Sequence, residues 1–205
     1  MNNTPSILPH HIDTGNYLPD EQFDKAYPRR IQQLSARHWT PVRVAALGAS
    51  FLAEDKGSRI LDIGSGAGKF CLVGAQQRPA SNFYGIEQRK KLVQIAEKAR
   101  KRLGLENAVF IEGNFTQIDF RKFDHFYFYN SFYENLVEDE YHIDESIDHS
   151  LSLYEYYTHY LYRLFAGRPV GTKLVTYHSY KEVVPDSYRL VSDHYHSLLR
   201  YWIQE

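Results

Sequence analysis

The sequence predicts an α/β fold: a single doubly wound sheet, mostly parallel, with an antiparallel C-terminal strand and helices on both faces. The first observation is that short apolar runs alternate with longer amphipathic segments between residues 59 and 130, as in strands joined by crossover helices. The second is a glycine-rich turn at 64–68, directly after the first apolar run. With 205 residues, the chain suits one such domain and is too short for two ordinary ones.

The N-terminal part precedes this alternation. Residues 1–17 predict a flexible arm, and short helices are expected at 20–26 and 29–37, on either side of Pro28. We therefore expect two regions: an arm with short helices, 1–38, and the main domain, 39–205.

The main domain is expected to open with a helix. Thr40 is a suitable N-cap and Pro41 a suitable first helical residue, and Val44, Leu47 and Phe51 then recur on one face. The next elements are strands at 59–63, 82–87, 108–112 and 123–130, with helices at 69–77 and 89–103.

Beyond residue 130 the regular alternation stops. Residues 133–150 form an acidic and aromatic insert, and the apolar spacing from Leu153 to Leu164 predicts a helix after it. A strand is expected at 172–177, and two further strands at 188–195 and 198–203 are joined by a tight connection.

The glycine turn is the strongest functional signal. Glycines are needed where the backbone turns sharply and a ligand approaches it closely, and the following helix offers free N–H groups there. A dinucleotide fingerprint would place its third glycine at position 69, which is Lys69. A phosphate-binding loop would need glycine at position 63 and Ser or Thr at position 70, which are Ile63 and Phe70.

The remaining pattern, Asp62-x-Gly64-x-Gly66-x-Gly68, resembles the first motif of class I S-adenosylmethionine (SAM)-dependent methyltransferases. This resemblance implies a Rossmann-like fold, SAM as cofactor and an enzyme, with the glycine turn under the methionine part of SAM. Glu87 ends the second strand about twenty residues later, where a carboxylate grips ribose hydroxyls.

Further segments extend the resemblance. Asn114 and Phe115 follow the third strand, where the family contacts adenine, and Thr40-Pro41 either simply starts a helix or resembles a turn that closes over the SAM carboxylate. The predicted cofactor-binding residues are Thr40, Asp62, Gly64, Ser65, Gly66, Gly68, Glu87, Gln88, Asn114, Phe115 and Asn130.

The predicted catalytic residues are Asn130 and Tyr133, at the end of the fourth strand. Asn130-Ser131-Phe132-Tyr133 lacks the prolines of the Asn-Pro-Pro-Tyr motif and is more similar to the Asn-Asn-Phe segment of Dot1-type lysine methyltransferases. Methyl transfer needs alignment of donor and acceptor and no covalent residue. Asn130 could accept a hydrogen bond from an amine, and Tyr133 could wall the acceptor.

Charge guides the choice of acceptor. The formal net charge of −1, from 24 basic and 25 acidic residues, argues against a nucleic-acid partner. The acidic insert instead favours an amine, either on a protein lysine or on a small molecule. Two alternatives stay open: O- or N-methylation of a small aromatic metabolite, and a SAM-binding domain without catalysis.

Other features carry less weight. His194 and His196 could share one face of a strand, but a metal is not predicted, because Asn130 stands where metal-dependent relatives have Asp. Cys71 is single and reads as a packed side chain. The sequence predicts no membrane segment and a cytoplasmic location, and it gives no oligomeric state.

Overall fold

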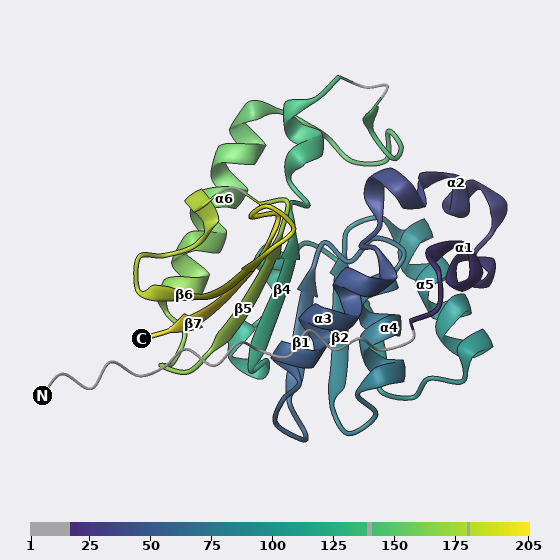
Figure 1. Ribbon diagram of the computed structural model, residues 1–205. Coiled ribbons are helices and arrows are strands. Elements are labelled where there is room, and N and C mark those ends of the chain that lie inside the picture. The colour runs from purple at the N-terminus through teal and green to yellow at the C-terminus, as the bar shows by residue number, and fades with distance from the viewer. Residues whose placement is uncertain (1–16, 139–140, 180) are drawn as a thin grey trace, which may run out of the picture.

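The computed structural model describes residues 17–138, 141–179 and 181–205, so most of the predicted N-terminal arm lies outside the described residues. Its centre is a seven-stranded sheet of order β3-β2-β1-β4-β5-β7-β6 (Figure 1). The strands are β1 (Arg59–Ile63), β2 (Asn82–Glu87), β3 (Ala108–Glu112), β4 (His125–Tyr129), β5 (Lys173–Tyr177), β6 (Tyr188–His194) and β7 (Leu199–Gln204).

The strand directions confirm the predicted sheet. β3, β2, β1, β4 and β5 pair in parallel, and β7 runs antiparallel to both β5 and β6. The order reverses at β1, because β2 lies on one side of it and β4 on the other. Ligands of open α/β sheets bind beyond the carboxyl ends of the strands at such a reversal.

Helices cover both faces of the sheet. They are α1 (Asp20–Phe23), α2 (Arg29–His38), α3 (Val42–Leu52), α4 (Lys69–Gln77), α5 (Lys90–Leu103) and α6 (Leu151–Ala166). α3, α4 and α5 pack on one face. On the other face α6 contributes Leu161 and Phe165, which pack with Phe126 and Phe128 of β4.

The crossover from β3 to β4 is short. In the described residues between these strands there are only two 3-10 turns, η2 (Phe115–Gln117) and η3 (Phe120–Lys122). Phe115 and Phe120, which belong to these turns, are buried in the same cluster as the α6 side chains. They cover this part of the sheet in place of a helix.

The expected N-cap at Thr40 is wrong. Pro41 holds the N-cap position of α3, and the helix begins at Val42. The Val42 N–H is satisfied by a remote side chain, because it donates to Asp20 Oδ1 over 3.0 Å. Thr40 instead shares a hydrogen bond of 3.0 Å with the hydroxyl of the buried Tyr127.

The N-terminal helices are tied to the sheet by a buried lysine. Lys69, at the start of α4, has 2% of its side chain exposed. Its Nζ lies 2.7 Å from Asp24 Oδ1 and 2.5 Å from Asp20 Oδ1, and it donates to Ser35 Oγ over 2.9 Å. The predicted boundary between 1–38 and 39–205 therefore falls within one connected set of ion pairs, and the division stays a prediction.

Within the described part of the chain, no helix has the length and apolar character needed to cross a membrane.

Candidate functional site

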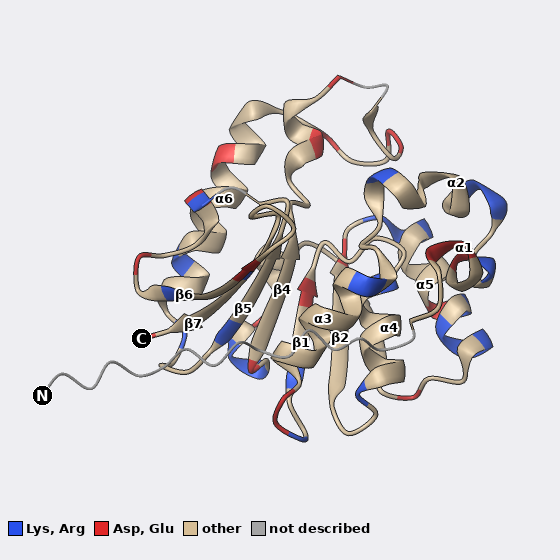
Figure 2. Ribbon diagram, viewed as in Figure 1, with Lys and Arg blue, Asp and Glu red and all other residues tan. Residues whose placement is uncertain are grey.

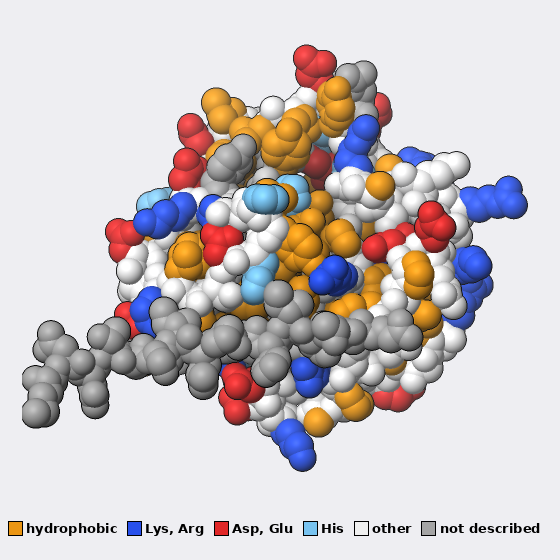
Figure 3. All heavy atoms as spheres, viewed as in Figure 1, with side chains coloured by type: hydrophobic (Ala, Val, Ile, Leu, Met, Phe, Trp, Pro, Cys, Tyr) orange, Lys and Arg blue, Asp and Glu red, His pale blue; other side chains and the backbone are white. Residues whose placement is uncertain are grey.

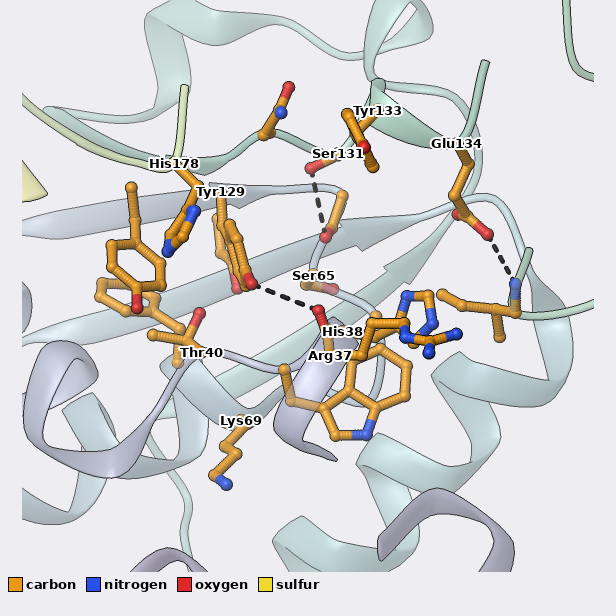
Figure 4. Close-up of a pocket in the computed structure, with 18 of the residues that line it drawn as sticks. Arg37, His38, Thr40, Ser65, Lys69, Tyr129, Ser131, Tyr133, Glu134 and His178 are labelled. Atoms are coloured by element: carbon orange, nitrogen blue, oxygen red, sulfur yellow. Dashed lines mark hydrogen bonds between the residues drawn. The ribbon is translucent and has the colours of Figure 1, made fainter. Parts of the chain in front are cut away.

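A cavity of about 520 Å³ opens at the carboxyl ends of β1, β4 and β5, beside the end of β2. Its walls come from the end of α2, the glycine turn, the ends of β4 and β5, and the insert (Figure 4). In Figure 3 hydrophobic side chains gather on this face between the insert and the N-terminal helices. The volume and the mixed lining are those of a small-molecule site.

The glycine turn forms one wall of the cavity. Gly64 and Gly66 have φ angles of 74° and 55°, which favour glycine. A Cβ on Gly64 would lie 2.2 Å from Ser131 Oγ, and one on Gly66 would lie 2.5 Å from the Trp39 ring. We predicted these glycines from ligand approach, and the structure adds a second reason, since protein side chains already touch them.

Of the four turn residues predicted to bind cofactor, Gly64, Ser65 and Gly66 line the cavity. Gly68 does not belong to the lining. A Cβ there would lie 2.4 Å from the Phe110 ring, so Gly68 serves the packing of α4 against the sheet.

Asp62 is buried at the end of β1 and lines the cavity. Burial raises the pKa of its carboxyl to about 8, and the nearby Glu87 carboxylate acts in the same direction. Cys71 Sγ lies 3.7 Å from Asp62 Oδ2 and donates the opposing hydrogen bond. Cys71 itself is fully buried, as the sequence predicted.

Glu87 lies at the end of β2 with 6% of its surface exposed. Its Oε2 accepts from the Gly66 N–H over 3.0 Å, and its Oε1 accepts from the Arg89 N–H over 2.8 Å. Burial raises the pKa of this carboxyl, while the Arg89 and Gly66 N–H groups oppose the shift. The predicted ribose ligand is therefore also the group that fixes the glycine turn.

Arg89 joins the end of β2 to the insert, and sequence reasoning missed this role. Its side chain is only 5% exposed, and it donates to Glu134 Oε2 over 3.0 Å and to Asp144 Oδ1 over 3.2 Å. We interpreted these acids as an attraction for a basic substrate. Two of them are instead neutralised by an internal cation.

Replacing Arg89 by methionine should loosen the insert. Glu134 and Asp144, whose side chains are 13% and 22% exposed, would lose their cationic partner. After allowance for solvent screening, this loss should destabilise the folded insert by about 1–3 kcal/mol. We expect limited proteolysis within 133–150 to be at least about tenfold faster. Arg121→Met is the control, since that exposed side chain pairs with Asp119. Equal cleavage rates in the two variants would refute this role.

A second, smaller cavity adjoins the first and is lined by Gln88, Phe115 and Tyr157 among others. Asn114 is absent from the lining of both cavities. Its Oδ1 accepts from the Thr116 N–H over 3.0 Å, and its amide donates to Tyr157 over 2.8 Å and to Gln88 Oε1 over 3.0 Å. The Asn114 side chain thus organises its neighbours in the structure, and its contact with a cofactor stays a prediction.

Asn130 and Tyr133, the predicted catalytic residues, both line the main cavity. Ser131, between them, donates to the Ile63 carbonyl over 2.5 Å and so joins the end of β4 to the end of β1. The lining also contains residues that were not among the predicted site residues: Arg37, His38, Trp39, Tyr177 and His178. His178 could have been found from its place directly after a predicted strand.

His194 and His196 lie outside the lining of this cavity. His194 Nε2 is 2.8 Å from Ser192 Oγ, which accounts for it within β6. Among the described residues, no group of three or more His, Cys, Asp or Glu side chains is arranged to hold a metal ion.

The fold and the place of the cavity are those of class I SAM-dependent methyltransferases. Residues 54–149 match the family model described as "Methyltransferase domain". The predicted class is therefore confirmed, whereas the finer likeness to Dot1-type lysine methyltransferases is not supported by these findings.

Named relatives are more specific. A tRNA (guanine-N(7)-)-methyltransferase of Microcystis aeruginosa is 54% identical over 54 residues, 26% of each chain. An enzyme of the same name from Synechococcus is 50% identical over 54 residues, 26% of this chain and 23% of the relative. The matched segment spans about a quarter of the length of these relatives.

Solved structures share the fold. An RNA methyltransferase from Salinibacter ruber, in complex with S-adenosyl-L-homocysteine, superposes with a TM-score of 0.57 at 21% identity, over 80% of this chain and 92% of that one. TrmN from Thermus thermophilus gives a TM-score of 0.55 at 18% identity, over 90% of this chain and 52% of that one.

These relatives overturn our argument against a nucleic-acid partner, and with it the preference for a protein lysine or another basic amine. The physical reason is that net charge sums the whole chain. Lys and Arg are spread unevenly and lie densely over α2 and α5 (Figure 2). We treated the acids of the insert as evidence against an RNA substrate. Two of them, Glu134 and Asp144, form ion pairs with Arg89 inside the protein.

Proposed function

We propose that this protein is a SAM-dependent methyltransferase that acts on a ring nitrogen of an RNA base, with N7 of guanine in tRNA as the favoured acceptor. The observation that carries the proposal is one cavity with two unlike halves. Buried acids and the glycine turn form one half, and aromatic side chains at the ends of β4 and β5 form the other. The names of the relatives favour guanine N7 of tRNA as the acceptor.

The acidic half suits the cofactor. SAM supplies an activated methyl group on a positively charged sulfur, together with an amino acid end and a ribose. Asp62 and the backbone of Gly64 and Gly66 would hold the amino acid end, and Glu87 would hold the ribose hydroxyls. Both carboxyls are buried, so a charged hydrogen bond made there is strong.

The aromatic half suits a flat base. Tyr129, Tyr133, Tyr177 and His178 border it, and bases removed from a stack are held between such side chains in RNA-binding proteins. Guanine N7 carries a free lone pair, so no side chain has to remove a proton. The new N–C bond would replace the C–S bond of SAM, and the positive charge would pass from sulfur to the base. The protein's part is alignment in a site that excludes water.

Basic side chains of α2 and α3 could meet the RNA backbone. Arg37, in the last turn of α2, lines the cavity and lies over the Tyr141 ring at 5.2 Å. Arg29 and Arg30 are exposed at the start of the same helix, and Arg43 is exposed on α3. Phosphate contacts of this kind make binding weaker as salt rises.

The proposal is tested by incubating the protein with labelled SAM and unmodified tRNA transcripts. Nuclease digestion and mass spectrometry of the nucleosides should then reveal 7-methylguanosine. Labelled protein or metabolite with unlabelled RNA would overturn the proposed acceptor. Failure to bind SAM in calorimetry would overturn the enzyme class.

Glu87→Gln should weaken SAM binding about tenfold to hundredfold, because the variant loses a charge-assisted pair of hydrogen bonds. Titration calorimetry measures this. Glu112→Gln is a matched control, because Glu112 pairs with Glu87 in register at the end of β3 and its side chain is 50% exposed. Unchanged affinity in Glu87→Gln would exclude Glu87 as a cofactor ligand.

A further inference from the structure

The neighbouring strands β4 and β5 end in the same uncommon way. Tyr129 of β4 is in register with Tyr177 of β5. The next residues, Asn130 and His178, both have positive φ angles, of 28° and 49°. Residues other than glycine are uncommon in this region, and they cluster at functional sites, where the surrounding structure holds them.

Ser179 and a neighbouring turn hold both backbones in place. The Asn130 N–H donates to Ser179 Oγ over 3.1 Å, and Ser179 Oγ in turn donates to the Tyr177 carbonyl over 3.1 Å. The His178 N–H donates to the Leu198 carbonyl over 2.8 Å. These bonds fix the two residues by their main chains and leave their side chains for another role.

The two side chains face the cavity with unused polar groups. Both residues line it, Asn130 half-buried and His178 exposed, and Figure 4 shows His178 beside Tyr129. Across 17–138, 141–179 and 181–205, neither side chain makes a hydrogen bond. Asn130 offers one acceptor and an NH₂ donor, and a neutral histidine offers one of each. Partial burial lowers the pKa of His178, which favours this neutral form.

Aromatic rings lie beside the His178 ring. The His178 ring meets Tyr177 edge-on, with centroids 4.4 Å apart, and lies 5.8 Å from the Tyr129 ring. Tyr133, 48% exposed, also lines the cavity. A flat heterocycle would find stacking faces and hydrogen-bonding groups at one place.

We propose that Asn130 and His178 together recognise the six-membered ring of a purine base through hydrogen bonds to its polar edge. This leaves a nitrogen of the five-membered ring free to accept the methyl group, and a pyrimidine has no such second ring. The inference rests on the proposed function, because it assigns the acceptor half of the same cavity. It makes both residues determinants of base specificity.

The test compares wild type with Asn130→Ala, His178→Ala and His178→Gly. Glycine keeps the left-handed backbone without strain, so equal losses in the two His178 variants assign the effect to the side chain. We expect kcat/KM for tRNA to fall about tenfold to thirtyfold in each, with SAM affinity within about twofold of wild type in the two His178 variants. His196→Ala is the matched control, since His196 has a φ of 55°, is exposed and lies outside the cavity lining. Thermal unfolding checks that each variant is folded.

A binding arm separates this inference from the proposed function. The protein loaded with S-adenosylhomocysteine is titrated with a short cytidine oligonucleotide, with or without one central guanosine. Wild type should prefer the guanosine, and the His178 variants should lose that preference. RNA methylation unaffected by the variants would overturn the inference alone. If wild type methylates no RNA, the proposed function fails. The inference then depends on the binding experiment, and it is overturned as well if wild type and the His178 variants show the same preference for guanosine.

Discussion

Replacing Lys69 by methionine is expected to lower the free energy of unfolding by about 3–5 kcal/mol, because removing one partner of a buried ion pair leaves the other charge uncompensated. The Lys69 side chain is 2% exposed, and that of its more buried partner, Asp24, is 6% exposed. Lys69 Nζ lies 2.7 Å from Asp24 Oδ1. Methionine retains most of the volume, so the loss reflects charge. Urea unfolding at neutral pH measures the change.

Lys98→Met is the control, because Lys98 is exposed on α5 and its removal should change stability by less than about 0.5 kcal/mol. A second readout is local: the N-terminal helices should become more accessible to protease, since Lys69 joins Asp20, Asp24 and Ser35 to the sheet. A stability change as small as that of Lys98→Met would show that this cluster does not hold the helices.

Lys69 also shows where sequence reasoning stops. In the sequence it only helped to reject a dinucleotide fingerprint. Its partner Asp20 is 49 residues away along the chain, in a segment that we placed in a separate region. No periodicity or motif links the two, because the contact depends on how the N-terminal helices fold back on α4.

The parts predicted well depend on local patterns. The strand bounds 59–63, 82–87 and 108–112 agree with the structure, because each is a short apolar run with clear flanking turns. Among the predicted cofactor residues, Asp62, Gly66 and Glu87 line the cavity, because the glycine turn and the strand ends meet at one edge of a parallel sheet.

The parts missed depend on tertiary contacts. Arg89 belongs to the predicted helix at 89–103, where no sequence pattern indicates that it is buried against acids 45 and 55 residues later. Asn114 has the expected position after β3, and its oxygen also caps the following 3-10 turn, a contact that the sequence did not reveal. The same residue type can contact a ligand or satisfy the backbone, and only the geometry distinguishes these roles.

The free energy of unfolding of the wild type is expected to fall as pH rises from about 4 to about 8, and Asp62→Asn is expected to remove this decline. The folded carboxyl has a pKa of about 8, whereas an unfolded aspartate has one of about 3.9. In this window the unfolded chain ionises while the folded one keeps its proton, so wild type loses up to about 1.4 kcal/mol per pH unit from this group. Below the window both states are protonated, and above it both are ionised. Asparagine does not titrate, so the difference between the two proteins should grow with pH and then level off.

Urea unfolding at several pH values from 4.5 to 8 tests this, with Asp124→Asn as control. The pair with Arg59 lowers the pKa of Asp124, so Asp124 is ionised in both states across the window and its replacement should shift stability by a constant amount. If wild type and Asp62→Asn keep a constant difference, Asp62 is ionised in the folded protein.

A protonated Asp62 has a consequence for the proposed function: an incoming ammonium group favours its ionised form, so SAM binding should release a proton. Calorimetry in two buffers of different ionisation enthalpy counts that proton, and the burial that also raises the pKa of Glu87 makes Asp62→Asn the necessary comparison. Proton release that persists in Asp62→Asn would assign it to Glu87 instead.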